Sequence, residues 1–251
     1  MGPIVLVTGG SRGIGLSIVR GLAERATEGK IIVASRQKPA AEEVIAQLQN
    51  DRAKATFYPL ALDVTDDDSI RAAVREVTSV FGHLDEMLMP GSLVLVNNAG
   101  IASTPAADFS DLRSTFNTTF NTNITSVALI SHLFMPLLLE SGNPKIINLS
   151  SGRASIHALT TGTLPPTASV PYSVSKTALN VLTLEMSKSF QQVVFYAATP
   201  GHCSTALNGF RGKRDPEEGA GVIVELAVAE KGKYSMGFWE RVDGEMREVP
   251  W

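Results

Sequence analysis

Short β-branched runs alternate with helical patterns along most of the chain, and this alternation limits the possible folds more than any other feature. The runs are apolar on both faces, as strands are when helices cover both sides of a sheet. They are Ile4–Val7, Ile31–Ala34, Phe57–Leu62, Leu93–Val96, Lys145–Leu149 and Gln192–Ala197. Two long helical patterns, Phe109–Leu139 and Tyr172–Phe190, separate the later runs. The alternation predicts an α/β fold with a doubly wound parallel sheet and helices on both faces.

Length, charge and cysteine content restrict the class of protein. The 251 residues show no linker or composition break, so a single domain over 1–251 is expected. The net charge of −3, without blocks of like charge, disfavours a nucleic-acid partner. The longest apolar stretch, 127–139, is too short to span a bilayer, and the first apolar run is too short for an export signal. The short apolar runs therefore predict no membrane partner. The single cysteine, Cys203, cannot form an internal disulfide and favours a reducing, cytoplasmic location.

A glycine-rich turn follows the first run. It reads TGGSRGIG, with Gly9, Gly13 and Gly15 where the chain must turn tightly and approach a pyrophosphate. The helix behind it would direct free amides and a positive dipole end at the phosphates. A purely structural turn is the alternative. Strand, glycine turn and helix in this order predict a dinucleotide site in a Rossmann-type sheet.

The residues after the second run favour NADP over NAD. A carboxylate at this place would accept hydrogen bonds from the ribose 2′-hydroxyl, but the sequence has Ser35 and Arg36. Arg36, with Arg12 from the glycine turn, can bind a 2′-phosphate through charge-assisted hydrogen bonds, although a solvated surface arginine is the alternative. Asp63 follows the third run where an acceptor can meet the adenine amino group. Asn97–Gly100 ends the fourth run with small and amide residues that let the backbone pass close to a cofactor.

Tyr172 and Lys176 are spaced so that a helix sets them on one face. An ammonium beside a phenol favours the ionised phenol, and about 4 kcal/mol brings a tyrosine pKa from about 10 to about 7. Lys176, together with a cationic nicotinamide, is expected to supply this stabilisation. Tyr172 is therefore predicted to have a lowered pKa and to act as an acid or base near neutral pH.

Taken in order, these segments resemble the short-chain dehydrogenase/reductase family over nearly the whole chain. The matching segments are Thr8–Gly15, Asp63–Val64, Asn97–Gly100, Asn123, Ser150–Ser151, Tyr172 with Lys176, and Pro200–Gly201 with Thr205. The run 215–220 and the ending with Asp243, Gly244 and Trp251 are similar to the carbonyl-reductase-like branch of that family.

The resemblance implies a role for each matching residue. Tyr172 would protonate the carbonyl oxygen, Lys176 would bind the nicotinamide ribose and lower the Tyr172 pKa, and Ser151 would hydrogen-bond the substrate oxygen. Asn123 would anchor a water-linked proton relay to Lys176. The expected NADP(H)-binding residues are Gly9, Ser11, Arg12, Gly13, Ile14, Gly15, Ser35, Arg36, Asp63, Val64, Asn98, Ala99, Gly100, Tyr172, Lys176, Pro200, Gly201, Cys203 and Thr205.

Two segments are expected to contact the substrate beside Ser151 and Tyr172. The segment 203–214 corresponds to the lid of relatives and offers Leu207 and Phe210 as apolar contacts. Its glycines and basic residues predict mobility in the absence of ligand. The segment 152–171 is longer than in many relatives and is expected to be a substrate-facing loop.

Two departures from the family pattern affect the framework. Ser126 stands where the family often has glycine, and it is expected to alter helix packing near Asn123. Residues 86–91 are inserted before the fourth run, where they either disturb the strand or extend a surface loop.

Metal and thiol chemistry are not expected. The histidines show no metal-binding spacing among themselves or with carboxylates; they are His83, His132, His157 and His202. Cys203 has no recognisable base in the sequence and is expected to be a small packing residue.

The sequence therefore predicts an NADPH-dependent carbonyl reductase, working reversibly as an alcohol dehydrogenase on a small to medium-sized ketone or aldehyde. A non-catalytic NADP-binding regulator is the alternative, and the presence of all four catalytic positions argues against it. A dehydratase or epimerase of the extended relatives would need an added substrate domain, for which 251 residues leave little room. Relatives pair through the two long helices, so a homodimer or homotetramer is expected, with a monomer left open.

Overall fold

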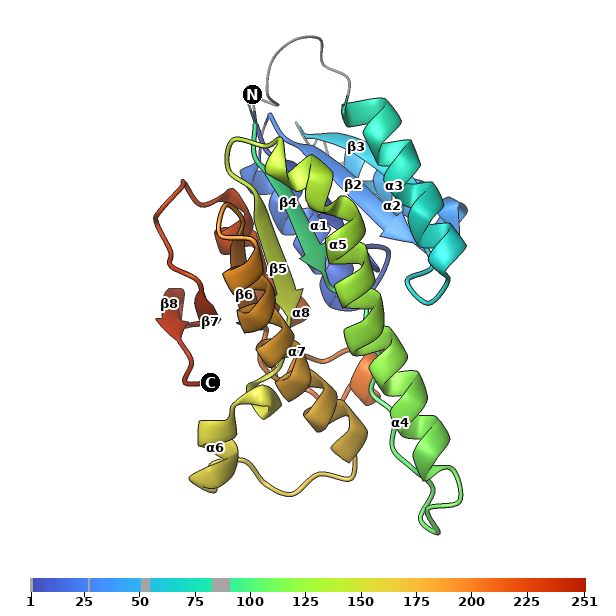
Figure 1. Ribbon diagram of the computed structural model, residues 1–251, viewed down its shortest axis with the longest axis vertical. Coiled ribbons are helices and arrows are strands. Elements are labelled where there is room, and N and C mark those ends of the chain that lie inside the picture. Colours follow the sequence, from blue (N-terminus) through green and yellow to red (C-terminus); the bar gives the residue numbers. More distant parts are fainter. Residues whose placement is uncertain (1, 27, 51–54, 83–90) are drawn as a thin grey trace.

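A sheet of eight strands lies at the centre of the computed structural model, which describes residues 2–26, 28–50, 55–82 and 91–251 (Figure 1). The strand order is β3-β2-β1-β4-β5-β6-β7-β8. The strands up to β7 pair in parallel, and β8 pairs with β7 in antiparallel fashion. Their bounds are β1 Ile4–Val7, β2 Lys30–Ser35, β3 Thr56–Ala61, β4 Leu93–Asn97, β5 Lys145–Leu149, β6 Val194–Thr199, β7 Gly237–Val242 and β8 Glu245–Glu248. The chain winds outward from β1 in both directions, which confirms the predicted doubly wound α/β fold.

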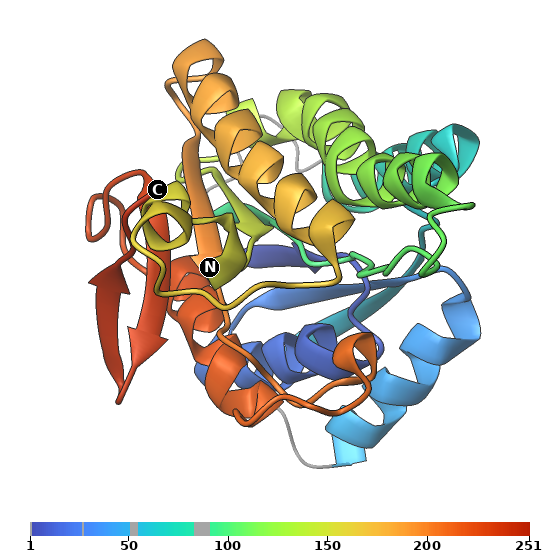
Figure 2. The ribbon, with the colours of Figure 1, turned by 90° about the horizontal axis from the view of Figure 1, so that it is seen from below.

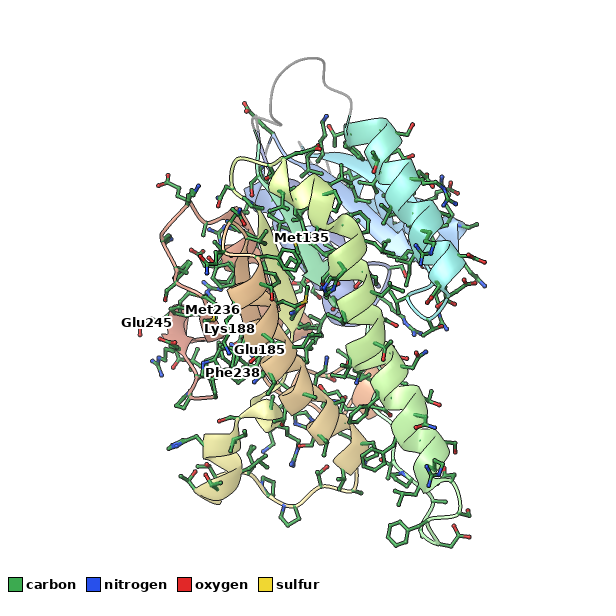
Figure 3. The ribbon with its side chains drawn as sticks, viewed as in Figure 1. Met135, Glu185, Lys188, Met236, Phe238 and Glu245 are labelled. Carbon is green, nitrogen blue, oxygen red and sulfur yellow. The ribbon has the colours of Figure 1, made fainter. Side chains whose placement is uncertain are left out.

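Helices cover both faces of the sheet (Figure 2). One face carries α1 (Gly13–Arg25), α2 (Lys38–Asn50) and α8 (Pro216–Val228). The other carries α3 (Asp67–Phe81), α5 (Ser126–Leu139) and α7 (Val170–Ser189), and an exposed ion pair, Glu185 with Lys188, marks the outer surface of α7 (Figure 3). A π-helical turn (Asn121–Thr125) joins α4 (Leu112–Phe120) to α5, and α6 (Ile156–Thr160) is a short helix beyond the end of β5.

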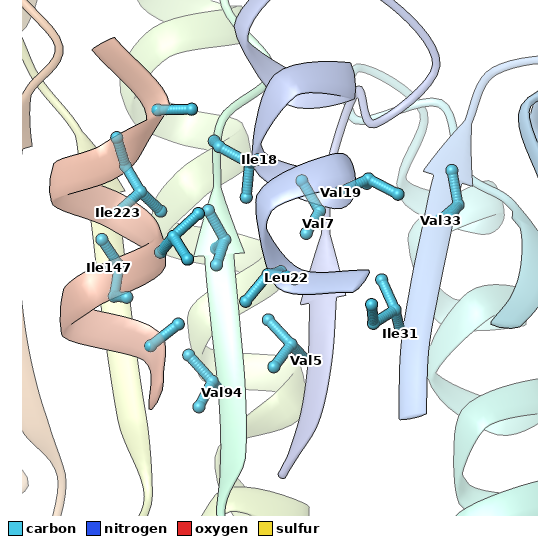
Figure 4. Packing of buried hydrophobic residues seen from close by; sticks show 14 of the residues in the cluster. Val5, Val7, Ile18, Val19, Leu22, Ile31, Val33, Val94, Ile147 and Ile223 are labelled. Carbon is cyan, nitrogen blue, oxygen red and sulfur yellow. The ribbon is translucent and has the colours of Figure 1, made fainter. Parts of the chain in front are cut away.

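Each central strand contributes to two apolar layers. Val5 and Val7 of β1 point toward α1 and α8, where they pack with Leu22 and Ile223 (Figure 4). Leu6 points to the opposite layer, beneath α3, α5 and α7. Because successive side chains of a strand point to opposite faces, a run that is apolar at every position fills both layers. This is the physical reason why the continuous apolar runs predicted a sheet covered on both sides.

The last part of the chain departs from the sequence prediction. β6 begins at Val194 instead of Gln192, because Gln192 is exposed in a turn and the buried residues continue to Thr199. The sequence patterns also predicted neither α8 nor the β7–β8 pair. β7 is buried only at Gly237 and Phe238 and only partly buried over its last four residues. A partly exposed strand of this kind, the last but one of the sheet, lacks the continuous apolar run by which the central strands were recognised.

The inserted segment 86–91 lies outside the described residues except for Gly91. The strand that follows it is regular, since all of Leu93–Asn97 is buried and β4 pairs with β1 on one side and with β5 on the other. The insertion therefore does not disturb β4.

One helical stretch, Leu112–Leu139, is 28 residues long and contains an 18-residue window with a mean hydropathy of 1.5. By length and composition alone it could cross a membrane. Its apolar window is 56% buried inside the protein. The α5 side chains Ile130, Phe134 and Leu138 pack in the layer beneath the sheet. This packing is that of a core helix, and its bounds lie within the predicted helical pattern Phe109–Leu139.

Lys145 is a buried cation at the amino end of β5. Its ammonium donates to the main-chain oxygens of Leu226 and Ala227, each at 3.1 Å, and to that of Ala229. Burial lowers the pKa of Lys145 to about 8, and the charge of Glu225 opposes this shift. At neutral pH the ammonium is still mainly protonated, so it supplies three donors to the carbonyls that α8 leaves without helical partners.

Replacing Lys145 by methionine is expected to destabilise the fold, because the end of α8 would keep buried carbonyls without a donor. The free energy of unfolding should fall by about 2 to 4 kcal/mol, measured by urea denaturation. The exposed Lys188→Met variant should change it by no more than about 0.5 kcal/mol. Equal effects of the two substitutions would contradict the role of Lys145.

Candidate active site

The carboxyl ends of the parallel strands meet at one edge of the sheet, the lower edge in Figure 1, where α6 also lies. In doubly wound sheets ligands bind at this edge. Five of the predicted site segments begin where these strands end, starting at Thr8, Ser35, Asn98, Ser150 and Pro200. Parallel pairing therefore brings together residues that are far apart in the sequence.

The glycine turn is folded tightly against the end of β4. Gly9 and Gly13 have φ angles of 63° and 53°, in the left-handed region that favours glycine. A Cβ atom on Gly15 would collide with the Gly9 carbonyl oxygen and lie 2.6 Å from Nδ2 of Asn98. The side-chain amide of Asn98 also donates to the Thr8 carbonyl at 2.7 Å. The turn thus has the close backbone approach that a pyrophosphate cradle needs.

Helix α1 begins behind this turn with free amides. The Leu16 amide donates to the Arg12 carbonyl at 3.2 Å. The amides of Gly13, Ile14 and Gly15 have no main-chain acceptor in the described part of the chain. Together with the positive end of the helix dipole, these amides form a donor set that fits an anionic group such as a phosphate.

Two exposed arginines flank this part of the edge: Arg12 lies in the glycine turn, directly before α1, and Arg36 directly follows β2. Ser11 Oγ donates to Ser35 Oγ at 3.2 Å, which joins the glycine turn to the end of β2 beside Arg12 and Arg36. Within residues 2–26, 28–50, 55–82 and 91–251, neither arginine forms an ion pair with a carboxylate. The two guanidinium groups are therefore available to an anionic ligand.

Asp63 follows β3 on the same edge, next to the buried Val64. The Thr65 amide and hydroxyl donate to its carboxylate at 2.9 and 2.7 Å. These two hydrogen bonds hold the pKa of Asp63 below its usual value, and the charge of Arg36 adds to the effect. Asp63 is therefore an ionised acceptor near Arg36, with part of its capacity used by its own loop.

Tyr172 and Lys176 lie within α7, as their spacing predicted. Lys176 Nζ lies 5.9 Å from the centre of the Tyr172 ring and donates to the Leu149 carbonyl at 2.6 Å. This bond ties α7 to the end of β5, directly before Ser150 and Ser151. Burial lowers the pKa of Lys176 to about 8.

The pKa of Tyr172 is raised in the protein without cofactor, whereas the predicted lowering includes the charge of a bound nicotinamide and stays a prediction. Burial raises the pKa, while interaction with the Ser151 hydroxyl and the charge of Arg153 act against it. Lys176 does not reverse the shift, because its ammonium is bonded to the Leu149 carbonyl and lies beside the ring. The spacing correctly placed the two residues together but gave no measure of how deeply the phenol is buried.

Asn123 is fully buried in the π-helical turn between α4 and α5. Its side-chain amide donates to the Ile101 carbonyl and to Ser175 Oγ, both at 2.9 Å, and its oxygen accepts from the Ile101 amide at 3.0 Å. Ser126 lies next to this turn, and its hydroxyl donates to the Asn121 carbonyl at 2.8 Å. A glycine at this position would lack this hydrogen bond. The side chain of Asn123 therefore links the loop after β4 to α7.

Segment 203–214 has a fixed base and an exposed tip. Its ends are joined by the Ser204 amide, which donates to the Arg214 carbonyl at 2.8 Å, and Arg214 also donates to the Pro200 carbonyl at 3.3 Å. Leu207 and Phe210 at the tip are 45% and 69% exposed. The base is thus better anchored than its composition suggested, and the mobility of the segment without ligand stays a prediction.

Three further predicted positions lie at the base of this segment. Gly201 has a φ angle of 77° and faces Arg214, and Thr205 is buried close to Gly13. Burial raises the pKa of Cys203 to about 11, and its thiol donates to the Pro200 carbonyl at 3.2 Å. Cys203 is therefore a protonated packing residue, as expected.

The described ranges, 2–26, 28–50, 55–82 and 91–251, contain no group of three His, Cys, Asp or Glu side chains that could hold a metal ion. His83 lies outside the described residues.

Segment 152–171 forms a short turn, α6 and an irregular stretch that leads into α7. The last residues of the chain hold it in place: Ser155 Oγ donates to the Pro250 carbonyl, and the His157 amide donates to the Trp251 main-chain oxygen at 3.0 Å. The Trp251 ring stacks on Phe238 with centroids 5.6 Å apart. No local pattern could have predicted this contact, because about 95 residues separate its two sides.

The comparisons with known proteins agree on one family. The family model described as short chain dehydrogenase matches residues 3–215. A short-chain dehydrogenase/reductase of Aspergillus fumigatus is 37% identical over 266 residues, covering 99% of this chain and 97% of the relative. A short-chain dehydrogenase of Penicillium roqueforti is 32% identical, covering 94% and 92%. Among solved structures, NADPH-bound carbonyl reductase from chicken fatty liver matches with a TM-score of 0.77 and 27% identity over 98% of both chains.

Trp251→Ala is expected to loosen the segment around α6, since it removes the stack on Phe238. An aromatic pair is worth about 0.5 to 1.5 kcal/mol beyond its burial, so amide hydrogen exchange at 157–161 should become about 2- to 10-fold faster. Trp239→Ala is the matched control, because Trp239 packs on Tyr234 and not on this segment. Unchanged exchange in Trp251→Ala, or the same acceleration in both variants, would show that Trp251 does not hold the segment.

Proposed function

Because the chain belongs to the short-chain dehydrogenase/reductase family, we propose that it is an NADPH-dependent carbonyl reductase acting reversibly on small to medium-sized ketones or aldehydes. The observation that carries the proposal is the position of Tyr172 and Lys176, which α7 holds beside the Ser151 end of β5. The chicken carbonyl reductase with bound NADPH, similar over almost the whole chain, supports it.

NADP(H) is the cofactor, and the residues at the carboxyl edge fit it. The left-handed Gly9 and Gly13 and the free amides at the start of α1 would hold the pyrophosphate. Arg12 and Arg36, which have no carboxylate partner among the described residues, would hold the 2′-phosphate. The remaining cofactor contacts follow the family pattern, at Asp63, Asn98–Gly100, Pro200–Gly201, Cys203 and Thr205. When bound, the cofactor supplies the hydride.

Tyr172 is assigned the role of general acid. Its raised pKa keeps the phenol protonated at neutral pH, which is the form needed to donate a proton to a carbonyl oxygen. Ser151 would donate a hydrogen bond to the same oxygen as negative charge develops. Lys176 would hold the nicotinamide ribose with the donors that the Leu149 carbonyl leaves free.

Asn123 would support this arrangement in two ways. Its side chain holds the loop after β4 against α7, so that Gly100 and Lys176 stay close together. It would also anchor the proposed water-linked proton relay to Lys176. Because the side-chain amide is already bonded to Ile101 and Ser175, the relay water would have to bind the main chain of the π-helical turn.

The substrate would lie between segments 152–171 and 203–214. Leu207 and Phe210 are the exposed apolar residues of the second segment, and they would contact the substituents of the ketone. We further propose that copies of the chain pair through the long helices, because Val174 and Val181 are exposed on α7. The buried Cys203, without a disulfide partner in the sequence, suits a reducing cytoplasm.

Arg36→Asp is expected to reverse the cofactor preference. Loss of one charge-assisted contact should weaken NADPH binding by at least about tenfold, and the new carboxylate should repel the 2′-phosphate and favour NADH. Titration of both cofactors by fluorescence measures the two dissociation constants. Arg247→Asp, on the far edge of the sheet, should leave them unchanged. A preserved preference for NADPH in Arg36→Asp would contradict the assignment.

Tyr172→Phe is expected to remove the proton donor without disturbing the cofactor site. The kcat for ketone reduction should fall by a factor of about 10² to 10⁴, with NADPH affinity nearly unchanged. Tyr234→Phe, remote from the site, should retain its kcat. Retention of more than about a tenth of the wild-type kcat in Tyr172→Phe would argue against this acid. Wild-type protein that binds NADPH but reduces no ketone or aldehyde would favour the non-catalytic regulator.

A further inference from the structure

Arg153 is a partly buried cation that the proposed hydride transfer does not use. It lies two residues after Ser151, in the turn Gly152–Ala154. Its amide donates to Ser151 Oγ at 3.3 Å, and its carbonyl accepts from Ser173 Oγ at 3.1 Å. Since Ser173 is the neighbour of Tyr172 on α7, the backbone of Arg153 is fixed between the two residues that would bind the substrate oxygen.

The guanidinium of Arg153 has donors to spare. It has five N–H donors, and one terminal nitrogen donates to the Pro165 carbonyl at 3.0 Å. Across 2–26, 28–50, 55–82 and 91–251, no carboxylate lies within ion-pair distance of it. A partly buried charge without an opposite charge costs free energy unless a ligand compensates it.

The charge of Arg153 also reaches the proton donor. It acts on the Tyr172 phenol against the effect of burial. Because Arg153 lies two residues after Ser151 and its carbonyl accepts from Ser173, next to Tyr172, a carbonyl oxygen bound by Ser151 and Tyr172 would bring the adjoining part of the substrate close to Arg153.

We propose that Arg153 determines specificity by binding a carboxylate of the substrate, so that the preferred substrates are keto acids or aldehyde acids with the carboxylate close to the reacting carbonyl. The planar guanidinium matches a carboxylate through two parallel hydrogen bonds. The apolar Leu207 and Phe210 would contact the rest of the substrate. The inference rests on the proposed carbonyl reductase activity and narrows its substrate class.

The test compares keto acids with their methyl esters, which keep the ketone and lose the charge. Wild-type enzyme should prefer the acid. Arg153→Met should lower kcat/KM for the acid by at least about tenfold, while the value for the ester should change by less than about threefold. Arg153→Lys should retain part of the preference because it keeps the charge. The exposed Lys188→Met should behave like the wild type (Figure 3).

An equal loss for acid and ester in Arg153→Met would overturn the inference, because it would mean that Arg153 only holds the loop through Pro165. A wild-type preference for esters would also overturn it. Calorimetric titration of the same keto acids into the NADP⁺ complex separates this inference from the proposed function. Binding that Arg153→Met weakens at least about tenfold supports the inference even without turnover, whereas binding that is insensitive to Arg153, or no binding, contradicts it.

Discussion

Hydrogen bonds at both ends of the loop after β4 link the glycine turn to helix α7, and the geometry of the whole site depends on them. Asn98 bonds to the Thr8 carbonyl, which fixes the turn against the end of β4. The loop that follows is held through Ile101 by the Asn123 side chain, and Asn123 in turn bonds to Ser175 within the Tyr172–Lys176 segment. The proposed phosphate site and the proposed proton donor are therefore held in register by partly buried polar contacts and by the buried Asn123–Ser175 bond, which are costly to break.

The central strands and the Tyr172–Lys176 pair could be predicted from the sequence because both depend on short-range rules. The apolar runs of β1 and β4 are buried at every position, and residues four apart share a helix face in any helix. Strand β7 could not be found in this way, since only its first two residues, Gly237 and Phe238, are buried. The contact of Trp251 with the α6 segment, and the buried state that raises the Tyr172 pKa, arise only from tertiary packing.

Positive charge is distributed over two parts of the site with different surroundings. Arg12 and Arg36 are exposed, so they can meet a phosphate in solvent at little desolvation cost. Lys176 is buried, and its ammonium donates to the Leu149 carbonyl. Its pKa of about 8 leaves it mostly protonated at neutral pH. Tyr172, with its raised pKa, is then a proton donor rather than a proton acceptor. The protein without ligands is thus in the protonation state that the proposed carbonyl reduction requires.

In the proposed reaction a hydride passes at this edge of the sheet from the cofactor to a substrate carbonyl. This transfer can be followed with NADPH that carries deuterium at C4 of the nicotinamide, in separate experiments for each of the two positions, with mass spectrometry of the alcohol. One of the two labelled cofactors, and only one, should give an alcohol with a single carbon-bound deuterium, because a fixed site presents one face of the ring. An alcohol that carries no deuterium from either cofactor would contradict direct hydride transfer.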